Sequence, residues 1–176
     1  MGMNYFIQPD RELDCPNDFP EGLSYFFEQV GGYGEGSEVA QVSGLLGLDL
    51  SAFQHYGYFD DEDEPQFWQD LGGFIALVDA FLRRLAEEPH YYRAINHRTP
   101  TNWEATTEQL EATLLSPDTS MAYDLLAQLP KMPQNPYPED RGYLSSGQLG
   151  QDLQTLRQTL ACYQQYGAQK IMLIYG

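Results

Sequence analysis

The residues best placed to do chemistry lie between positions 55 and 64, where aromatic rings come directly before an unbroken run of carboxylates. The stretch contains His55, Tyr56, Tyr58, Phe59, Asp60, Asp61, Glu62, Asp63 and Glu64. A histidine and a carboxylate that meet in a pocket can exchange protons with a substrate. Aromatic rings beside carboxylates also offer apolar contact area and attraction for Lys or Arg. The stretch is therefore compatible with hydrolysis or with binding of a basic partner.

Two structural explanations of the same stretch remain open. The rings of residues 56 to 59 can tuck beneath a loop and complete the core, because large aromatic side chains are mostly buried. Asp63 and Glu64 can complement the partial positive charge at the start of a helix, with Pro65 in its first turn. The run lacks the alternating Asp pattern and the later Glu of a calcium loop. We therefore predict no metal and no cofactor.

Other reactive residue types are sparse and widely separated. His90 and His97 are seven positions apart and have no obvious third ligand for a metal. The glycine-rich segment 31–36 follows a predicted helix and adds acidic charge, which indicates a loop rather than a phosphate cradle. The two cysteines, Cys15 and Cys162, have no metal-ligand spacing. We predict Cys162 to be a small buried side chain, and the sequence leaves a disulfide with Cys15 open.

A long amphipathic helix must position the acidic stretch. Apolar residues recur at alternating spacings of four and three, which predicts a helix from about 66 to 86. They are Phe67, Leu71, Phe74, Val78, Phe81 and Leu85. Gly72 and Gly73 fall inside this helix, where each costs ~1 kcal/mol relative to Ala, and they indicate a kink or the close approach of another element.

The remaining pattern predicts one α+β domain over residues 1–176, mostly helical, with five or six helices packed on a small sheet. Apolar runs at 3–8 and 169–175 predict the N- and C-terminal strands, paired with each other. Because both runs are unbroken, we expect the first strand to be buried on both faces and the last to be central in the sheet. Further helices are predicted after Pro20, from Ser37, over 101–115 and 116–129, and from about 147 to 166. Residues 48–54 fit either a strand or a helix. Four prolines make 130–142 an irregular loop.

The net charge of −17 is concentrated in the first half of the chain. Residues 1–82 hold 16 acidic side chains and one basic side chain, so their net charge is 1 − 16 = −15. Residues 83–176 hold 8 bases and 10 acids, so their net charge is 8 − 10 = −2. Such charge disfavours binding to nucleic acid or to anionic lipid, both of which require Lys and Arg. It favours a basic partner, although acidic surfaces also serve solubility alone.

These observations predict a non-catalytic binding protein whose acidic N-terminal half masks a basic protein partner, for example a toxin or nuclease domain. In composition the chain resembles immunity proteins and nuclease inhibitors. The predicted contact residues are Tyr33, Tyr56, Tyr58, Phe59, Asp60, Asp61, Glu62, Asp63 and Glu64. The alternatives are a hydrolase that uses carboxylates with His55 or His90, and a self-assembling structural subunit. No secretory signal or membrane span is recognisable, which predicts a cytoplasmic protein.

Overall fold

The computed structural model describes residues 5–27, 37–58, 67–95 and 141–175. Over these ranges the protein is α+β, with five α-helices and a four-stranded mixed sheet that contains both terminal strands. The predicted fold class is therefore confirmed. The predicted helices at 101–115 and 116–129, and residues 130–140 of the loop predicted at 130–142, lie outside the described residues. The last two residues of that predicted loop are instead helical, because they begin the helix α6 (Arg141–Ser145). Within the described ranges, no helix combines the length and the apolar character needed to cross a bilayer.

The C-terminal strand β4 (Lys170–Tyr175) is the centre of the sheet. The N-terminal strand β1 (Tyr5–Pro9) pairs with it in antiparallel fashion, with Phe6 opposite Ile174. On the other side of β4, strand β2 (Tyr56–Tyr58) runs parallel and β3 (Gln69–Asp70) antiparallel. The predicted pairing of the chain ends and the central position of the last strand are both correct. The strands β2 and β3 were not predicted, and they have only three and two residues.

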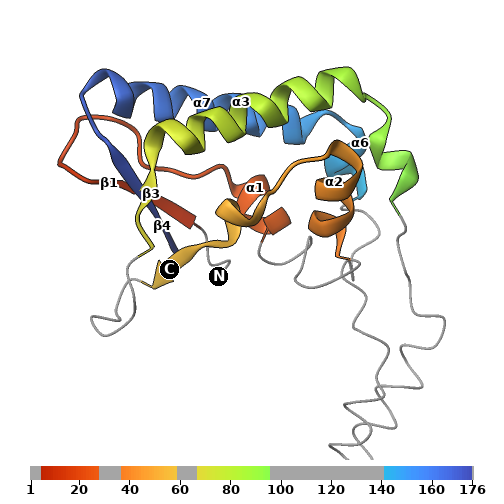
Figure 1. The fold of residues 1–176 in the computed structure, drawn as a ribbon, viewed down its shortest axis with the longest axis horizontal. Coiled ribbons are helices and arrows are strands. Elements are labelled where there is room, and N and C mark those ends of the chain that lie inside the picture. Colours follow the sequence, from red (N-terminus) through yellow and green to blue (C-terminus); the bar gives the residue numbers. More distant parts are fainter. Residues whose placement is uncertain (1–4, 28–36, 59–66, 96–140, 176) are drawn as a thin grey trace, which may run out of the picture.

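Two long helices lie side by side over one face of the sheet (Figure 1). They are α3 (Leu71–Glu87) and α7 (Gln148–Gln165). The predicted apolar stripe of α7 is buried throughout, at Leu149, Leu153, Leu156, Leu160 and Tyr163. The core lies between these helices and the inward side chains of the sheet, which include Tyr5, Ile7, Ile171 and Leu173.

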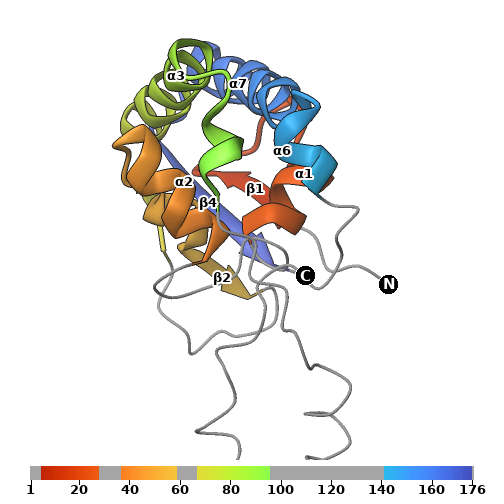
Figure 2. The ribbon, with the colours of Figure 1, turned by 90° about the vertical axis from the view of Figure 1, so that its right-hand side faces the viewer.

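Three shorter helices close one end of this core (Figure 2). They are α1 (Glu21–Tyr25), α2 (Glu38–Leu46) and α6 (Arg141–Ser145). The helix predicted from Ser37 is confirmed: the Ser37 hydroxyl accepts a hydrogen bond from the Ala40 N–H, and Gly47 ends the helix in the left-handed conformation. Helix α1 begins directly after Pro20, as predicted, and no side chain caps it.

Helix α3 begins five residues later than the apolar periodicity predicts. The Asp70 carboxylate accepts a hydrogen bond of 2.6 Å from the Gly73 N–H, so Asp70 caps the helix and the residues before it are extended. Gly72 and Gly73 thus fall in the first turn, where a Cβ on either would lie 3.3 Å from the capping oxygen. Phe67 is 40% exposed and does not belong to the helical stripe.

Strand β1 buries only one of its faces, although its apolar run predicted burial on both. Tyr5 and Ile7 point into the core at 1% exposure each, while Phe6 is 36% exposed on the opposite face. The reason is that the described helices pack on the face of the sheet that carries Tyr5 and Ile7 (Figure 1). The undecided segment 48–54 contains a short 3-10 helix, η2 (Ser51–Gln54), whose Phe53 is fully buried.

Candidate functional site

Most of the predicted contact residues lie outside the described part of the chain. This applies to Tyr33, Phe59 and residues 60–64. Tyr58 ends β2, and its side chain is not described. Tyr56 is half-buried, and its ring centroid lies 5.3 Å from that of Tyr5 on the core side of the sheet. This packing favours the alternative in which the Tyr56 ring completes the core, and its role in partner binding stays a prediction.

The two described histidines do not meet. The His55 carbonyl accepts a hydrogen bond from the Gln69 side chain, just before α3 begins. His90 follows the other end of α3, a helix of 17 residues that is ~26 Å long at the usual rise per residue. Each imidazole lies beside one aromatic ring, Phe67 for His55 and Tyr92 for His90. Among the described residues, no group of three His, Cys, Asp or Glu is arranged to hold a metal ion.

The structure instead presents a hollow of about 980 Å³ on the face of the sheet opposite the described helices. Phe6 and Ile174, which are cross-strand neighbours, line it together with Trp68. The opposite wall is formed by residues 10–18, which we call the acidic loop. Asp10, Arg11, Glu12, Leu13, Cys15 and Asn17 contribute to this wall. The hollow therefore combines an apolar, partly aromatic floor with a charged rim.

A disulfide between Cys15 and Cys162 fixes the acidic loop to α7. The bond joins residues 147 positions apart, and their Cα atoms are 6.1 Å from each other. Both cysteines are half-buried, so the prediction of Cys162 as a buried apolar side chain is wrong. The sequence did carry a usable signal. Each cysteine lies a few residues from a predicted terminal strand, and pairing those strands brings the two neighbourhoods together.

Hydrogen bonds hold the loop at further points. The buried Tyr163 side chain donates from its hydroxyl to the Pro16 carbonyl at 2.7 Å, and that hydroxyl also lies 3.3 Å from the Ile7 carbonyl. Burial and, after it, the charge of Asp18 raise the pKa of Tyr163 to about 12. The Ile7 N–H donates to the Asn17 carbonyl at 3.0 Å, which closes the loop against β1. The acidic loop is therefore fixed to α7 and β1.

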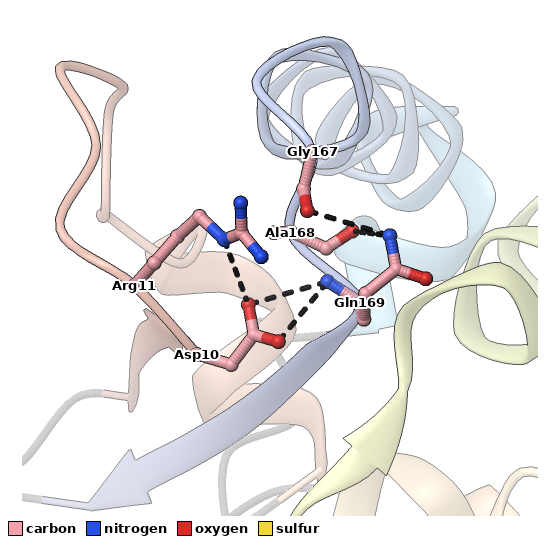
Figure 3. A network of polar contacts seen from close by, with 5 residues as sticks. All are labelled: Asp10, Arg11, Gly167, Ala168 and Gln169. Carbon is pink, nitrogen blue, oxygen red and sulfur yellow. Dashed lines mark hydrogen bonds and ion pairs between the residues drawn. The ribbon is translucent and has the colours of Figure 1, made fainter.

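Asp10 anchors the beginning of the loop to the turn between α7 and β4 (Figure 3). Both oxygens of its carboxylate accept from the Gln169 N–H at 3.2 Å. The Arg11 guanidinium lies beside the same carboxylate, with Nε 3.7 Å from Oδ1. The Gln169 side chain donates back to the carbonyls of Gly167 and Ala168. Asp10 thus has a local structural role.

The other acids of the loop have no such role. Glu12, Asp14 and Asp18 are exposed, and within the described residues the ion pairs of the chain involve other carboxylates. With Arg11 and Asp10 included, the net charge of the loop is 1 − 4 = −3. Like charges this close repel one another. The loop therefore holds negative charge at a fixed place beside the hollow.

A second polar group lies at the other end of the molecule, where the helices α1 and α6 meet α7. We call Tyr91, Tyr143 and Asp152 the tyrosine cluster. The Tyr143 hydroxyl donates to Asp152 at 2.9 Å, and Gln148 donates to the other oxygen of this carboxylate at 2.8 Å. Burial, and then the Asp152 charge, raise the pKa of Tyr143 far above its ordinary value. Burial likewise raises the pKa of Tyr91, with Glu38 adding to the effect.

The tyrosine cluster is packed too tightly to admit a ligand beside Gly22. A Cβ at this position would collide with the Asp152 carboxylate and would lie 2.6 Å from the Tyr143 ring. The Tyr143 hydroxyl and the Asp152 carboxylate are hydrogen-bonded to each other, so the cluster has a structural role in helix packing. The hollow beside the acidic loop is therefore the better candidate for a functional site. No protein-family model, curated protein or solved structure matches the chain.

Proposed function

We propose that the protein is a non-catalytic binding protein whose acidic N-terminal half masks a basic surface of a protein partner, in the manner of an immunity protein or inhibitor. One observation carries the proposal: the acidic loop keeps Glu12, Asp14 and Asp18 exposed and without a cationic partner among the described residues, on a segment stapled to α7. A fixed cluster of one sign raises the rate of encounter with an oppositely charged partner and disfavours wrong ones.

The alternatives receive less support. A hydrolase that uses carboxylates and histidine requires His55 or His90 to meet a carboxylate in a pocket, whereas the hollow is lined by neither imidazole. A self-assembling subunit would have to bring together chains that each carry a net charge of −17, which repel one another.

The disulfide bears on where the protein acts. Disulfides persist in oxidising compartments and are rare in the reducing cytosol. The Cys15–Cys162 bond therefore favours an oxidising compartment over the cytoplasmic location expected from the sequence. Rapid alkylation of free thiols in lysed cells tests this location. Two labelled cysteines per chain would support the cytoplasm, and unlabelled chains would support an oxidising compartment.

The function is tested by measuring association with a basic probe over a range of salt concentrations. We expect a dodecamer of arginine to bind the oxidised full chain and a dodecamer of glutamate not to bind. The association rate should fall steeply as salt rises, because screening shortens the reach of the charges. Reversing the charges of residues 60–64 should slow association more than it destabilises the fold. Association that is insensitive to salt, or equal for both peptides, would refute the proposal.

A further inference from the structure

We propose that the hollow beside the acidic loop is the docking site for an extended segment of the basic partner, and that this segment places an arginine side chain between the loop and the aromatic floor. The inference rests on the proposed function and goes further by naming the site and the chemistry that it recognises.

The floor of the hollow is apolar, and none of the described helices packs on this side of the sheet. Phe6 is 36% exposed, and its cross-strand neighbour Ile174 lies at the bottom of the hollow at 7% exposure. Trp68, in the extended residues before α3, adds a second aromatic side chain to the lining. Phe6 and Trp68 therefore give the hollow an aromatic lining, and aromatic residues are enriched at contact surfaces.

The rim selects the charge of the occupant. Asp10 is already engaged with the Gln169 N–H and with Arg11, whereas Glu12 lines the hollow and makes no ion pair within the described residues. A cation that enters the hollow would meet the Glu12 carboxylate on one side and aromatic rings on the other. Guanidinium suits this combination, because its plane stacks on aromatic faces while its N–H groups bind carboxylate.

The size and the surroundings of the hollow favour a segment of polypeptide. At about 980 Å³ it reaches the upper limit for small-molecule sites, and Gln8, Asp10 and Glu12 on its rim are open to solvent. A second copy of this chain is disfavoured by charge, since each copy carries −17. The wall is also fixed before binding, by the disulfide and by the Tyr163 hydrogen bond to Pro16. A preorganised wall costs less ordering entropy when the partner docks.

The experiment measures the affinity of the oxidised full chain for a nine-residue peptide of Gly and Ser with one central arginine and a second arginine two residues away. A matched peptide carries citrulline, which has nearly the same shape and no charge, at both positions. We expect the arginine peptide to bind about tenfold more tightly than the citrulline peptide, because charge-assisted bonds and cation–π contacts each contribute.

Two pairs of variants locate the binding. Phe6→Ala should weaken binding of the arginine peptide about tenfold and Glu12→Gln about fivefold, because each removes one contact to the guanidinium. Leu45→Ala removes another exposed apolar side chain, on α2, and Glu88→Gln removes another exposed charge, after α3. These two control variants should bind within about twofold of the unaltered protein, because they preserve both contacts. Circular dichroism and urea unfolding confirm that each variant is folded.

The possible failures are distinguishable. If Glu12→Gln and Glu88→Gln weaken binding equally, the acidic half attracts the peptide without using the hollow, so this inference fails and the proposed function stands. If neither this peptide nor the arginine dodecamer binds in a salt-dependent way, both fail. Equal binding of the citrulline peptide would show that charge is not recognised, and equal binding of arginine amide would show a small-molecule site. Either result would overturn the inference.

Discussion

The two ends of the molecule use carboxylates in opposite ways. At the tyrosine cluster, Asp152 accepts hydrogen bonds from Tyr143 and Gln148, so its charge is satisfied inside a packed contact between helices. In the acidic loop, Glu12 and Asp14 point to solvent and find no cation among the described residues. The first arrangement stabilises the fold, because buried polar groups are paired. The second does not, and this leaves its charge available for a partner.

The loop can hold the unneutralised charge of Glu12, Asp14 and Asp18 because its position does not depend on these three carboxylates. The Cys15–Cys162 bond, the Tyr163 hydroxyl and the Asp10 anchor keep the loop in place. The tyrosine cluster has no covalent support, and its order depends on close packing around Gly22. We therefore expect that removing charges from the acidic loop leaves the protein stable, whereas removing the contacts that fix the loop destabilises it. In the tyrosine cluster, either a larger side chain or the loss of a hydrogen-bond partner should destabilise the protein.

The largest expected effect is loss of the disulfide. The double substitution Cys15→Ser and Cys162→Ser should lower the free energy of unfolding by about 5 kcal/mol, because the bond closes a very long loop in the unfolded chain. Urea unfolding under non-reducing conditions measures this. The unaltered protein with a reducing agent present should match the double variant. Equal stability of the oxidised and reduced protein would show that the acidic loop depends on its non-covalent contacts alone.

The second effect is a loss of stability at alkaline pH. Folding raises the pKa of Tyr163 to about 12, against about 10 in the unfolded chain, so the folded state holds this proton more tightly. The stabilisation is complete below pH ~10 and disappears as pH rises from ~10 to ~12, with a total on the order of 3 kcal/mol. Urea unfolding at several pH values should show this decline.

Replacing Tyr163 separates its ionisation from that of other tyrosines. Tyr163→Phe should be less stable at neutral pH, because the Pro16 carbonyl loses its donor, and its stability should decline less above pH ~10. Tyr166→Phe alters an exposed ring on the same helix end and serves as the control. If the pH profile of Tyr163→Phe has the same slope as that of the control, ionisation of Tyr163 does not govern the alkaline loss.

The contrast between these regions also explains what sequence could and could not reveal. The stripe of α7 and the cap of α2 depend on neighbours within one or two turns, so local periodicity predicts them. The start of α3 does not follow the periodicity, because the Asp70 cap prevails over the apolar spacing that includes Phe67. The strand β3 has only two residues and exists because β4 lies beside it.

The hollow was still less accessible to sequence reasoning. Its lining comes from residues 6–17, from Trp68, and from α7 and β4, which only the fold brings together. The densest acidic run, residues 60–64, lies outside the described residues, so its role in partner binding stays a prediction. The four acidic residues of the loop are spread over nine positions with one Arg among them, so they form a weaker sequence pattern than the run at 60–64. They become important because the disulfide fixes the loop to α7.

The third effect tests the packing of the tyrosine cluster. Gly22→Ala should destabilise the protein by about 2 kcal/mol, because the added methyl group overlaps the Asp152 carboxylate and the Tyr143 ring. Gly44→Ala is the matched control: it lies within α2 with no atom near its would-be Cβ, so it should stabilise the protein by about 0.5–1 kcal/mol. Urea unfolding of both variants gives the difference. Equal effects would mean that α1 can shift away from α7 without cost.

The smallest expected effect is the sharpest test of the comparison, because it changes one carboxylate at each end. Glu12→Gln should change the free energy of unfolding by less than about 0.5 kcal/mol, and any change should be stabilising at low salt, since it relieves repulsion within the loop. Asp152→Ala should cost about 1–3 kcal/mol, because the partly buried Tyr143 hydroxyl loses its acceptor. If Glu12→Gln destabilises the protein, the Glu12 carboxylate stabilises the fold, as carboxylates do in the tyrosine cluster.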